Sequence, residues 1–191
     1  MIYKIISFII MIIFYLFYIY KLMDLNKKNI KTNQAGKGNK EKKVILIERV
    51  MSLSNVIQII SMVISVIIIN NYNNVYLNIL GIIFGILSIL FFSLATITMK
   101  NNWRVGIPEE KTSLVNYGIY KWSRNPAFVG FDLLYISNTI MFFNIPLLII
   151  SIISILTLHI QILQEEKHMI KMFEEEFNNY TKHTYRYFGR K

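Results

Sequence analysis

Cysteine is absent from the 191-residue sequence, so disulfide bonds, thiolate metal sites and cysteine nucleophiles are all excluded. Charged residues are also few, at 17% of the chain, whereas 54% of the residues are hydrophobic. A soluble domain carries roughly a quarter charged residues. The shortage of charge therefore excludes an ordinary soluble enzyme and indicates that lipid is the main solvent of this chain.

Acidic residues are scarce relative to basic ones, with 11 Asp and Glu against 21 Lys and Arg, which gives a formal net charge of +10. In a chain this apolar, such an excess is more typical of cytoplasmic loops and anionic lipid headgroups than of nucleic-acid binding. We therefore expect the lipid bilayer as a partner and no nucleic acid. The sequence leaves the oligomeric state open.

Long apolar runs are abundant. A helix needs about 20 mostly apolar residues to cross roughly 30 Å of hydrocarbon. Five stretches approach this length: about Ile5–Tyr20, Val50–Ile69, Val75–Met99, Pro126–Phe143 and Leu147–Leu163. The first stretch also has the length of a signal peptide, but no small-residue cleavage pattern follows it, so we expect a retained anchor. The sequence predicts an all-α, polytopic membrane protein with about five transmembrane helices.

The polar segments between these runs are basic and set the expected topology. The linker at 21–49 is rich in Lys, Asn and Gly, so we expect it to lack packed structure and to lie in the cytoplasm. The loop from Lys100 to Asn125 is basic as well and is also expected in the cytoplasm. These assignments predict an N-terminus outside the cell, a C-terminus in the cytoplasm, and residence in the cytoplasmic membrane.

Two hairpins and a final helix complete the predicted fold. The segment NNYNN at 70–74 is expected to be an exterior turn, and the break at Asn144-Ile145-Pro146 makes the last two spans an antiparallel pair. Gly81, Gly85 and Ser88 offer a small-residue face for close helix packing. The C-terminal segment predicts an amphipathic helix with one apolar stripe, formed by Leu163, Ile170, Phe173, Phe177 and Tyr180.

Two segments at the cytoplasmic edge carry the residues suited to chemistry: YGIYKWSRNPAFVG at 117–130 and HIQILQEEKHMIKMF at 159–173. If the last two spans are antiparallel neighbours, the start of one and the end of the other share a membrane face. Arg124 and Asn125 are then expected to approach Glu165 and Glu166. His159 lies seven residues before Glu166 and therefore on roughly the same helix face.

Structural explanations compete with functional ones at several of these positions. Asn125 followed by Pro126 is a good helix start, with asparagine as the N-cap and proline in the first turn. A lone histidine near a membrane edge, such as His159, is more often a hydrogen-bonded packing residue than a base. Asp132 and Asn138 are polar at membrane depth, where such residues face the bundle interior or a wet cavity.

In order and spacing, these segments resemble the C-terminal half of the membrane methyltransferases related to isoprenylcysteine carboxyl methyltransferase and the phospholipid N-methyltransferases. That superfamily has Gly-x-Tyr, then Arg-His-Pro-x-Tyr-x-Gly, a helical hairpin, Glu-Glu, a Phe, a Tyr and a basic tail. The corresponding residues are Gly118, Tyr120, Arg124, Asn125, Pro126, Phe128, Gly130, Glu165, Glu166, Phe173, Tyr180 and Arg186, preceded by a similar approach at Trp103, Arg104, Val105 and Gly106. The resemblance covers about half of the chain.

The resemblance implies methyl transfer from S-adenosylmethionine, without a metal, to a lipid or other membrane-partitioned acceptor with a carboxylate, amine or thiol group. It implies that residues 100–191 form the catalytic half, comprising the loop, the hairpin and the C-terminal helix, and that residues 1–99 form N-terminal spans with the basic linker. Arg124 and Glu166 are the implied catalytic residues. The implied cofactor-binding residues are Tyr120, Arg124, Asn125, Pro126, Phe128, Gly130, His159, Glu165 and Glu166.

Three positions depart from the superfamily pattern: Asn125 replaces histidine, Phe128 replaces tyrosine, and Gln161 replaces the arginine of some relatives. Asparagine still donates and accepts hydrogen bonds through its amide, so cofactor binding survives this change more readily than a proton-transfer role. Two alternatives stay open. The first is a non-catalytic membrane protein that retains the fold, and the second, less supported, is a small helical transporter or channel subunit.

Overall fold

The structure is a computed structural model that describes residues 1–69, 74–108, 110 and 112–191. The described residues form five α-helices and two short 3₁₀ helices, with no β-strand among them. In chain order the helices are α1 (Ile2–Lys27), α2 (Lys42–Ile68), α3 (Val75–Met99), η1 (Lys100–Asn102), η2 (Gly118–Lys121), α4 (Pro126–Met141) and α5 (Ile145–His183). The expected exterior turn at 70–74 lies almost wholly outside the described residues, as do Glu109 and Lys111.

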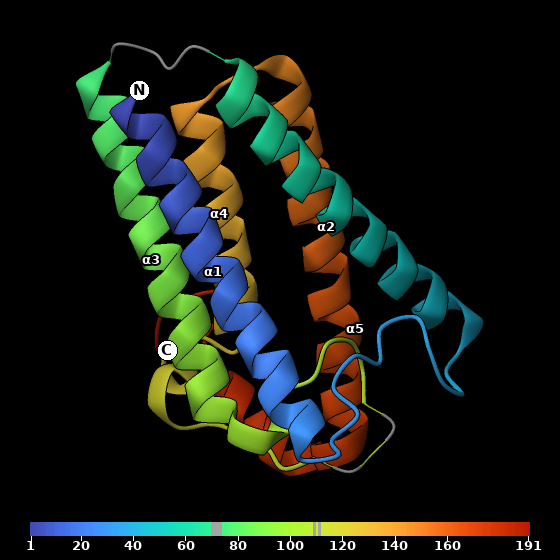
Figure 1. Cartoon of the computed structure of the whole chain (residues 1–191). Coiled ribbons are helices and arrows are strands. Elements are labelled where there is room, and N and C mark those ends of the chain that lie inside the picture. The colour runs from blue at the N-terminus through green and yellow to red at the C-terminus, as the bar shows by residue number, and fades with distance from the viewer. Residues whose placement is uncertain (70–73, 109, 111) are drawn as a thin grey trace.

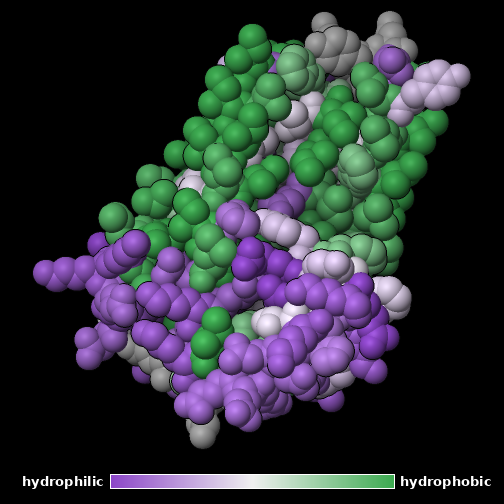
Figure 2. Space-filling view, turned by 180° about the vertical axis from the view of Figure 1, so that it is seen from behind, coloured by the Kyte–Doolittle hydropathy of each residue, from purple (hydrophilic) through white to green (hydrophobic). Residues whose placement is uncertain are grey.

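Four helices in the described part of the chain, α1, α2, α3 and α5, are long and apolar enough to cross a membrane. Their outward faces carry large apolar side chains that are half exposed, such as Ile12, Ile60 and Leu90. Figure 2 shows this apolar surface over most of the length of the molecule, with hydrophilic surface concentrated at one end. An exposed apolar belt of this extent is suited to lipid, so the chain is a polytopic helical membrane protein, as the sequence predicts.

The expected fourth span is the shortest of the five helices, because α4 has only 16 residues. At about 1.5 Å per residue it covers roughly 24 Å, less than the hydrocarbon thickness. The helix ends at Met141, and Asn144 then caps α5 by accepting a hydrogen bond from the Leu147 amide at 2.9 Å. The predicted break at 144–146 is therefore confirmed, and the two termini of the chain lie at opposite ends of the bundle (Figure 1).

The helices associate in two groups. Helix α3 packs along α4 and α1, whereas α2 packs along α5 (Figure 1). A polar contact joins the two groups, because the hydroxyls of Thr139 of α4 and Ser151 of α5 are 2.9 Å apart. Within the second group, Gln58 Nε2 of α2 donates to the same Ser151 hydroxyl at 2.9 Å. Polar groups at membrane depth thus find partners inside the bundle. Asn138 follows the same rule by accepting a hydrogen bond from Ser7, while Asp132 Oδ1 is buried with no partner among the described residues.

Close packing of α3 depends on small residues, as predicted. A Cβ atom on Gly81 would meet Met141 of α4, and one on Gly85 would meet Ile10 of α1. The reciprocal contact comes from Gly130 of α4, where a Cβ would lie 3.0 Å from the Phe92 amide nitrogen and the Ser88 carbonyl oxygen of α3. Backbone atoms cannot yield as a flexible side chain can, so Gly130 sets the distance between these two helices.

The C-terminal segment continues the last membrane helix, as expected, but it bends. Helix α5 continues without interruption past Leu163 to a kink at Glu174, where φ is 40°, and ends at His183. The kink separates the predicted apolar stripe into two parts: Phe177 and Tyr180 are buried, whereas Leu163 and Ile170 are exposed. The single-stripe prediction was therefore wrong, because the helix changes direction within the stripe.

The linker is also more ordered than predicted. Helix α1 extends to Lys27 and α2 begins at Lys42, since lysine and glutamate continue a helix readily beyond the hydrocarbon. Between them, Thr32 and Gln34 are buried, and Asn33 forms an isolated parallel bridge with Val105. The expectation of a linker without packed structure was wrong because its backbone pairs with the loop that follows α3.

We predict that Gly130→Val destabilises the bundle by roughly 1–3 kcal/mol, because the new side chain collides with the α3 backbone. Thermal unfolding in detergent measures the effect. The control is Ile83→Val on the lipid-facing side of α3, where the side chain is 47% exposed. Equal melting temperatures for the two variants would contradict the assigned packing.

Candidate functional site

The two chemistry-bearing segments meet at the hydrophilic end of the bundle. Arg124, just before α4, donates from Nε and Nη2 to Glu166 Oε1 of α5, at 3.0 and 2.9 Å. Both side chains are nearly buried, with exposed fractions of 9% and 11%. The contact predicted from the antiparallel hairpin is therefore present. The short connection at 142–144, at the opposite end of α4 and α5, produces it, since it brings the start of one helix beside the exit of the other.

Glu166 also holds the C-terminal tail at 184–191. Its second oxygen accepts hydrogen bonds from Arg186 Nε at 3.0 Å and from Arg186 Nη2 at 2.8 Å. This bond to a carboxylate raises the pKa of the Arg186 guanidinium. Two guanidinium groups thus share one carboxylate, with each oxygen serving one of them. The carboxylate has little capacity left for a ligand.

Backbone hydrogen bonds fix the tail against the segment before α4. The Arg124 amide donates to the Tyr185 carbonyl at 3.1 Å, Arg124 Nη1 donates to the Thr184 carbonyl at 2.6 Å, and the Gly189 amide donates to the Trp122 carbonyl at 2.6 Å. The tail therefore closes over the ion pairs and keeps Arg124 and Glu166 away from water.

Asn125 occupies the N-cap position of α4, and Pro126 occupies the first turn, as the structural explanation predicts. The Asn125 side chain makes no capping hydrogen bond. Its Nδ2 instead donates to Glu166 Oε1 and to the Arg186 carbonyl, both at 3.2 Å. Asn125 therefore starts the helix by backbone position and joins the ion-pair cluster through its side chain.

Tyr120 and Tyr180 tie η2 to the end of α5. The Tyr180 hydroxyl donates to the Tyr120 carbonyl at 2.5 Å, and both rings are buried. Burial raises the pKa of the Tyr120 phenol well above its usual value, and the neighbouring Tyr180 and Glu165 raise it further. The phenol consequently remains neutral in the physiological range and is available as a hydrogen-bond donor.

These segments line a partly open cavity. Its walls come from the loop at 103–108, from the segment at 112–128 and from the end of α5. Of the residues expected in a site, it is lined by Tyr120, Arg124, Asn125, Phe128, Glu165 and Glu166. The cavity thus combines aromatic rings, arginines and two adjacent carboxylates.

The two carboxylates differ in their surroundings. Glu166 binds Arg124 and Arg186 directly, whereas Glu165 accepts a hydrogen bond from the neutral Gln161 amide at 3.0 Å. Glu165 has no ion pair with the residues that the structure describes, and such a carboxylate is the better one to receive a positively charged ligand group. Glu165 is therefore the stronger candidate for contact with a ligand, and Glu166 is the stronger candidate for holding the site together.

Arg104 lines the same cavity, although sequence reasoning noted it only as part of the approach to the motif. Its side chain is 9% exposed, and its Nε is buried with no hydrogen-bond partner among the described residues. Its Nη1 donates to the carbonyls of Asn101 and Trp103, and its Nη2 forms a 3.5 Å ion pair with the exposed Glu110, so the guanidinium is fixed in place with Nε left over. A buried donor without a partner indicates a place where an anionic ligand group is favourable. Nothing in the sequence distinguishes Arg104 from the other basic residues of this loop, so its burial could not be predicted.

Three residues expected at the site are not among those that line the cavity. Pro126 is buried at the start of α4, Gly130 packs on α3, and His159 contacts the tail. His159 Nδ1 is 2.7 Å from the Tyr187 hydroxyl, and the two rings are stacked with centroids 5.9 Å apart. Burial raises the pKa of the Tyr187 phenol.

The fold and the cavity define a polytopic helical membrane protein with a charged site at the membrane boundary. Residues 76–176, more than half of the chain, match the family described as Phospholipid methyltransferase. The chain belongs to this family of membrane methyltransferases, in agreement with the superfamily expected from the motif. A comparison with curated proteins finds no match.

Removing the shared carboxylate should release the tail. We predict that Glu166→Ala destabilises the protein by about 3 kcal/mol, because two guanidinium groups lose their partner and Arg124 is left buried with an unpaired charge. Thermal unfolding and protease cleavage after residue 183 measure the two effects. Glu175→Ala, which removes an exposed carboxylate from the same helix, is the control. A tail equally resistant to protease in both variants would argue against this role.

Proposed function

We propose that the protein transfers a methyl group from S-adenosylmethionine to a lipid or another membrane-partitioned acceptor bearing a carboxylate, amine or thiol. The observation that carries the proposal is the cavity at the end of the membrane helices, built jointly by the segment before α4 and the acidic exit of α5. Membership in the Phospholipid methyltransferase family supports the same reaction class.

The cavity residues fit the chemical groups of this cofactor. S-adenosylmethionine supplies a methyl group on a positively charged sulfur, and it also carries an ammonium, a carboxylate and an adenine. Glu165 suits the ammonium, and the buried Nε of Arg104 suits the carboxylate. Tyr120, Trp103 and Phe128 offer aromatic faces to the sulfonium and the adenine.

Arg124, Asn125 and Glu166 have a different part in this proposal. Their hydrogen bonds are directed largely at one another and at the tail, so they hold the cavity wall rather than carry the main contacts to cofactor. A catalytic assignment for Arg124 and Glu166 remains a prediction, as does the division of the chain into N-terminal spans at 1–99 and a catalytic half at 100–191.

In this mechanism the protein contributes mainly alignment and dehydration. Methyl transfer is an in-line displacement, so its rate depends on holding donor and acceptor at the correct distance and angle. The tail and the aromatic lining exclude water from the reacting groups. A general base is needed only for a protonated amine acceptor, since a carboxylate or thiolate is already nucleophilic.

The surface suggests how a lipid-like acceptor reaches the site. In Figure 2 the hydrophilic end directly adjoins the apolar belt, and paler surface lies between two apolar ridges. An amphiphile moving within the bilayer would meet the cavity at this boundary. The basic segments at the hydrophilic end also favour an orientation with this end in the cytoplasm, where the cofactor is available.

We predict that Glu165→Gln and Arg104→Gln each raise the Kd for S-adenosylmethionine at least tenfold, because each removes a charge complementary to the cofactor. Titration calorimetry on purified protein in detergent measures the Kd. Glu175→Gln is the matched control. Unchanged affinity in both site variants would remove these two residues from the proposed site.

The reaction itself can be tested by incubating the wild-type protein with methyl-labelled S-adenosylmethionine and a total lipid extract. Label in a lipid fraction is the expected result and identifies the acceptor class. Tight cofactor binding without any labelled fraction would favour a non-catalytic protein that retains the fold. Absence of both binding and label at millimolar cofactor would overturn the proposal.

A further inference from the structure

The linker between α1 and α2 pairs with the loop that forms one wall of the cavity. The Gln34 amide donates to the Val105 carbonyl at 3.0 Å, and the Val105 amide donates to the Thr32 carbonyl at 2.9 Å. Two segments without regular secondary structure, about 70 residues apart in the sequence, therefore support one another. A buried side chain of α2 holds the two segments together.

That side chain is Glu48, which is completely buried although it is a carboxylate. One oxygen, Oε2, accepts from the Gly36 amide at 2.7 Å and from Lys40 Nζ at 2.8 Å. The other, Oε1, accepts from the Ile107 amide at 2.7 Å and from Lys40 Nζ at 3.0 Å. We call Glu48, Lys40 and the amides of Gly36 and Ile107 the Glu48 clasp.

The chemistry of the Glu48 clasp requires a carboxylate. A backbone amide points at each oxygen, so both oxygens must be acceptors, and glutamine would present an NH₂ group to one of these donors. Lys40 supplies the compensating charge and is itself 7% exposed, with a further hydrogen bond to the Gln34 carbonyl at 2.8 Å. A buried charge pair satisfied at every position has a defined geometry.

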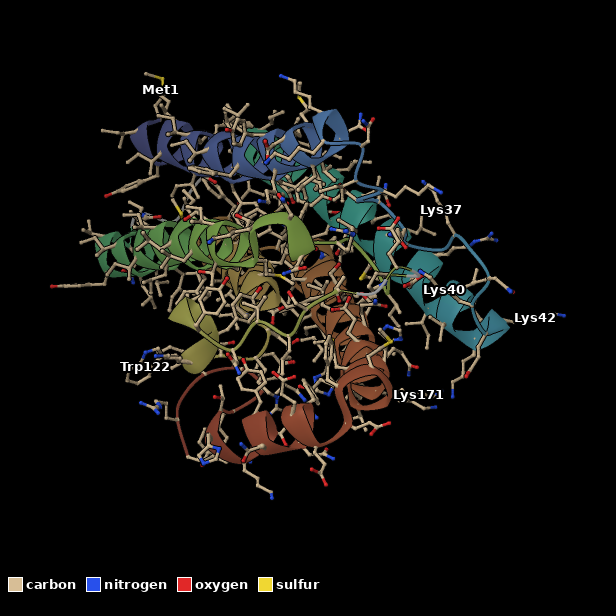
Figure 3. The ribbon with its side chains drawn as sticks, turned by 90° about the horizontal axis from the view of Figure 1, so that it is seen from below. Met1, Lys37, Lys40, Lys42, Trp122 and Lys171 are labelled. Carbon is tan, nitrogen blue, oxygen red and sulfur yellow. The ribbon has the colours of Figure 1, made fainter. Side chains whose placement is uncertain are left out.

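Lys40 differs in this respect from other lysines of the same region. Figure 3 shows Lys37, Lys40 and Lys42 along the edge formed by the linker and the start of α2, with Lys42 extending away from the molecule. Lys37 and Lys42 are exposed. Lys40 is therefore not simply a solvated residue of a basic loop. It is buried beside Glu48 and balances the charge of that carboxylate.

The loop approaches the clasp too closely for any side chain at position 106. Gly106 has a φ of +82°, and a Cβ there would lie 2.8 Å from both Glu48 Oε1 and the Ala35 Cα. Both the conformation and the space require glycine. The position of the loop is thus set from the linker side, by groups that do not line the cavity.

On the cavity side, the same loop provides Trp103, Arg104 and Ile107 to the wall. We propose that Glu48 is a positioning residue, which holds this wall, and Arg104 in particular, in place for cofactor binding. The inference rests on the proposed function for the identity of the ligand. The ordering of the wall by Glu48 can be tested without any cofactor.

The first test is hydrogen exchange of the Glu48→Gln variant, followed by mass spectrometry of peptides that contain Gly36 and Ile107. We expect exchange in both peptides to accelerate about tenfold or more, because one clasp amide loses its acceptor and the segments separate locally. Glu41→Gln, which removes an exposed carboxylate from the start of the same helix, should leave exchange unchanged.

The second test is the Kd for S-adenosylmethionine, which we expect to rise about tenfold in Glu48→Gln since Arg104 is displaced. At saturating cofactor, kcat should stay within about twofold of wild type, because the reacting groups are not altered. Lys40→Met keeps both backbone hydrogen bonds and should have an intermediate Kd, whereas Lys37→Met should match wild type. The comparison of Lys40→Met with Lys37→Met remains informative even if the Glu48→Gln variant does not fold completely.

Three outcomes separate the inference from the proposed function. Exchange in Glu48→Gln equal to that of wild type would overturn the clasp. Accelerated exchange with an unchanged Kd would reduce Glu48 to a structural residue and overturn its positioning role. Failure of the wild-type protein to bind S-adenosylmethionine would count against the proposed function, while the exchange comparison would still decide whether Glu48 orders the wall.

Discussion

The site depends on one carboxylate that serves two arginines. Glu166 belongs to α5, Arg124 to the segment before α4, and Arg186 to the C-terminal tail, so the shared carboxylate joins three parts of the chain. Burial makes this arrangement demanding, because each partner left alone is a desolvated charge. The three elements are therefore held together or released together. The cavity that they bound is therefore expected to form or open as a unit.

Glu48 is a second buried carboxylate, and it contacts the loop at 103–108 from the linker side. Irregular backbone near the membrane boundary exposes amides that neither a helix nor bulk water satisfies. Glu48 accepts two of these hydrogen bonds, from the Gly36 and Ile107 amides, whereas Glu166 accepts hydrogen bonds from side chains. Neighbouring cations balance both charges: Lys40 does so for Glu48, and Arg124 and Arg186 do so for Glu166. Two acidic residues on two long helices thus fix the segments that shape the cavity. The membrane helices thus provide a rigid support, and the segments between them provide many of the polar side chains that line the cavity.

The elements predictable from the sequence were those governed by local rules. Apolar run length identified the helices, and the hairpin break at Pro146 placed Arg124 beside Glu166, because antiparallel neighbours must share a face. Long-range backbone pairing has no such local signal. The Lys-rich composition of the linker suggested disorder, yet Thr32 and Gln34 are buried since they pair with a loop far along the chain. The burial of Arg104 and the different partners of Glu165 and Glu166 likewise follow from tertiary contacts, which composition does not encode.

The substitution of asparagine for histidine at position 125 can be understood from the tail. Asn125 Nδ2 donates two hydrogen bonds from one nitrogen, to the Glu166 carboxylate and to the Arg186 carbonyl. An amide nitrogen carries two hydrogens, whereas each nitrogen of an imidazole carries at most one. A single imidazole nitrogen at this position could donate to only one of these two acceptors. The other acceptor would have to be reached by the second ring nitrogen or lose its hydrogen bond. In this chain the Asn125 amide donates to both the Glu166 carboxylate and the tail. The departure from the superfamily pattern is therefore better explained as a structural adaptation of the site than as its loss.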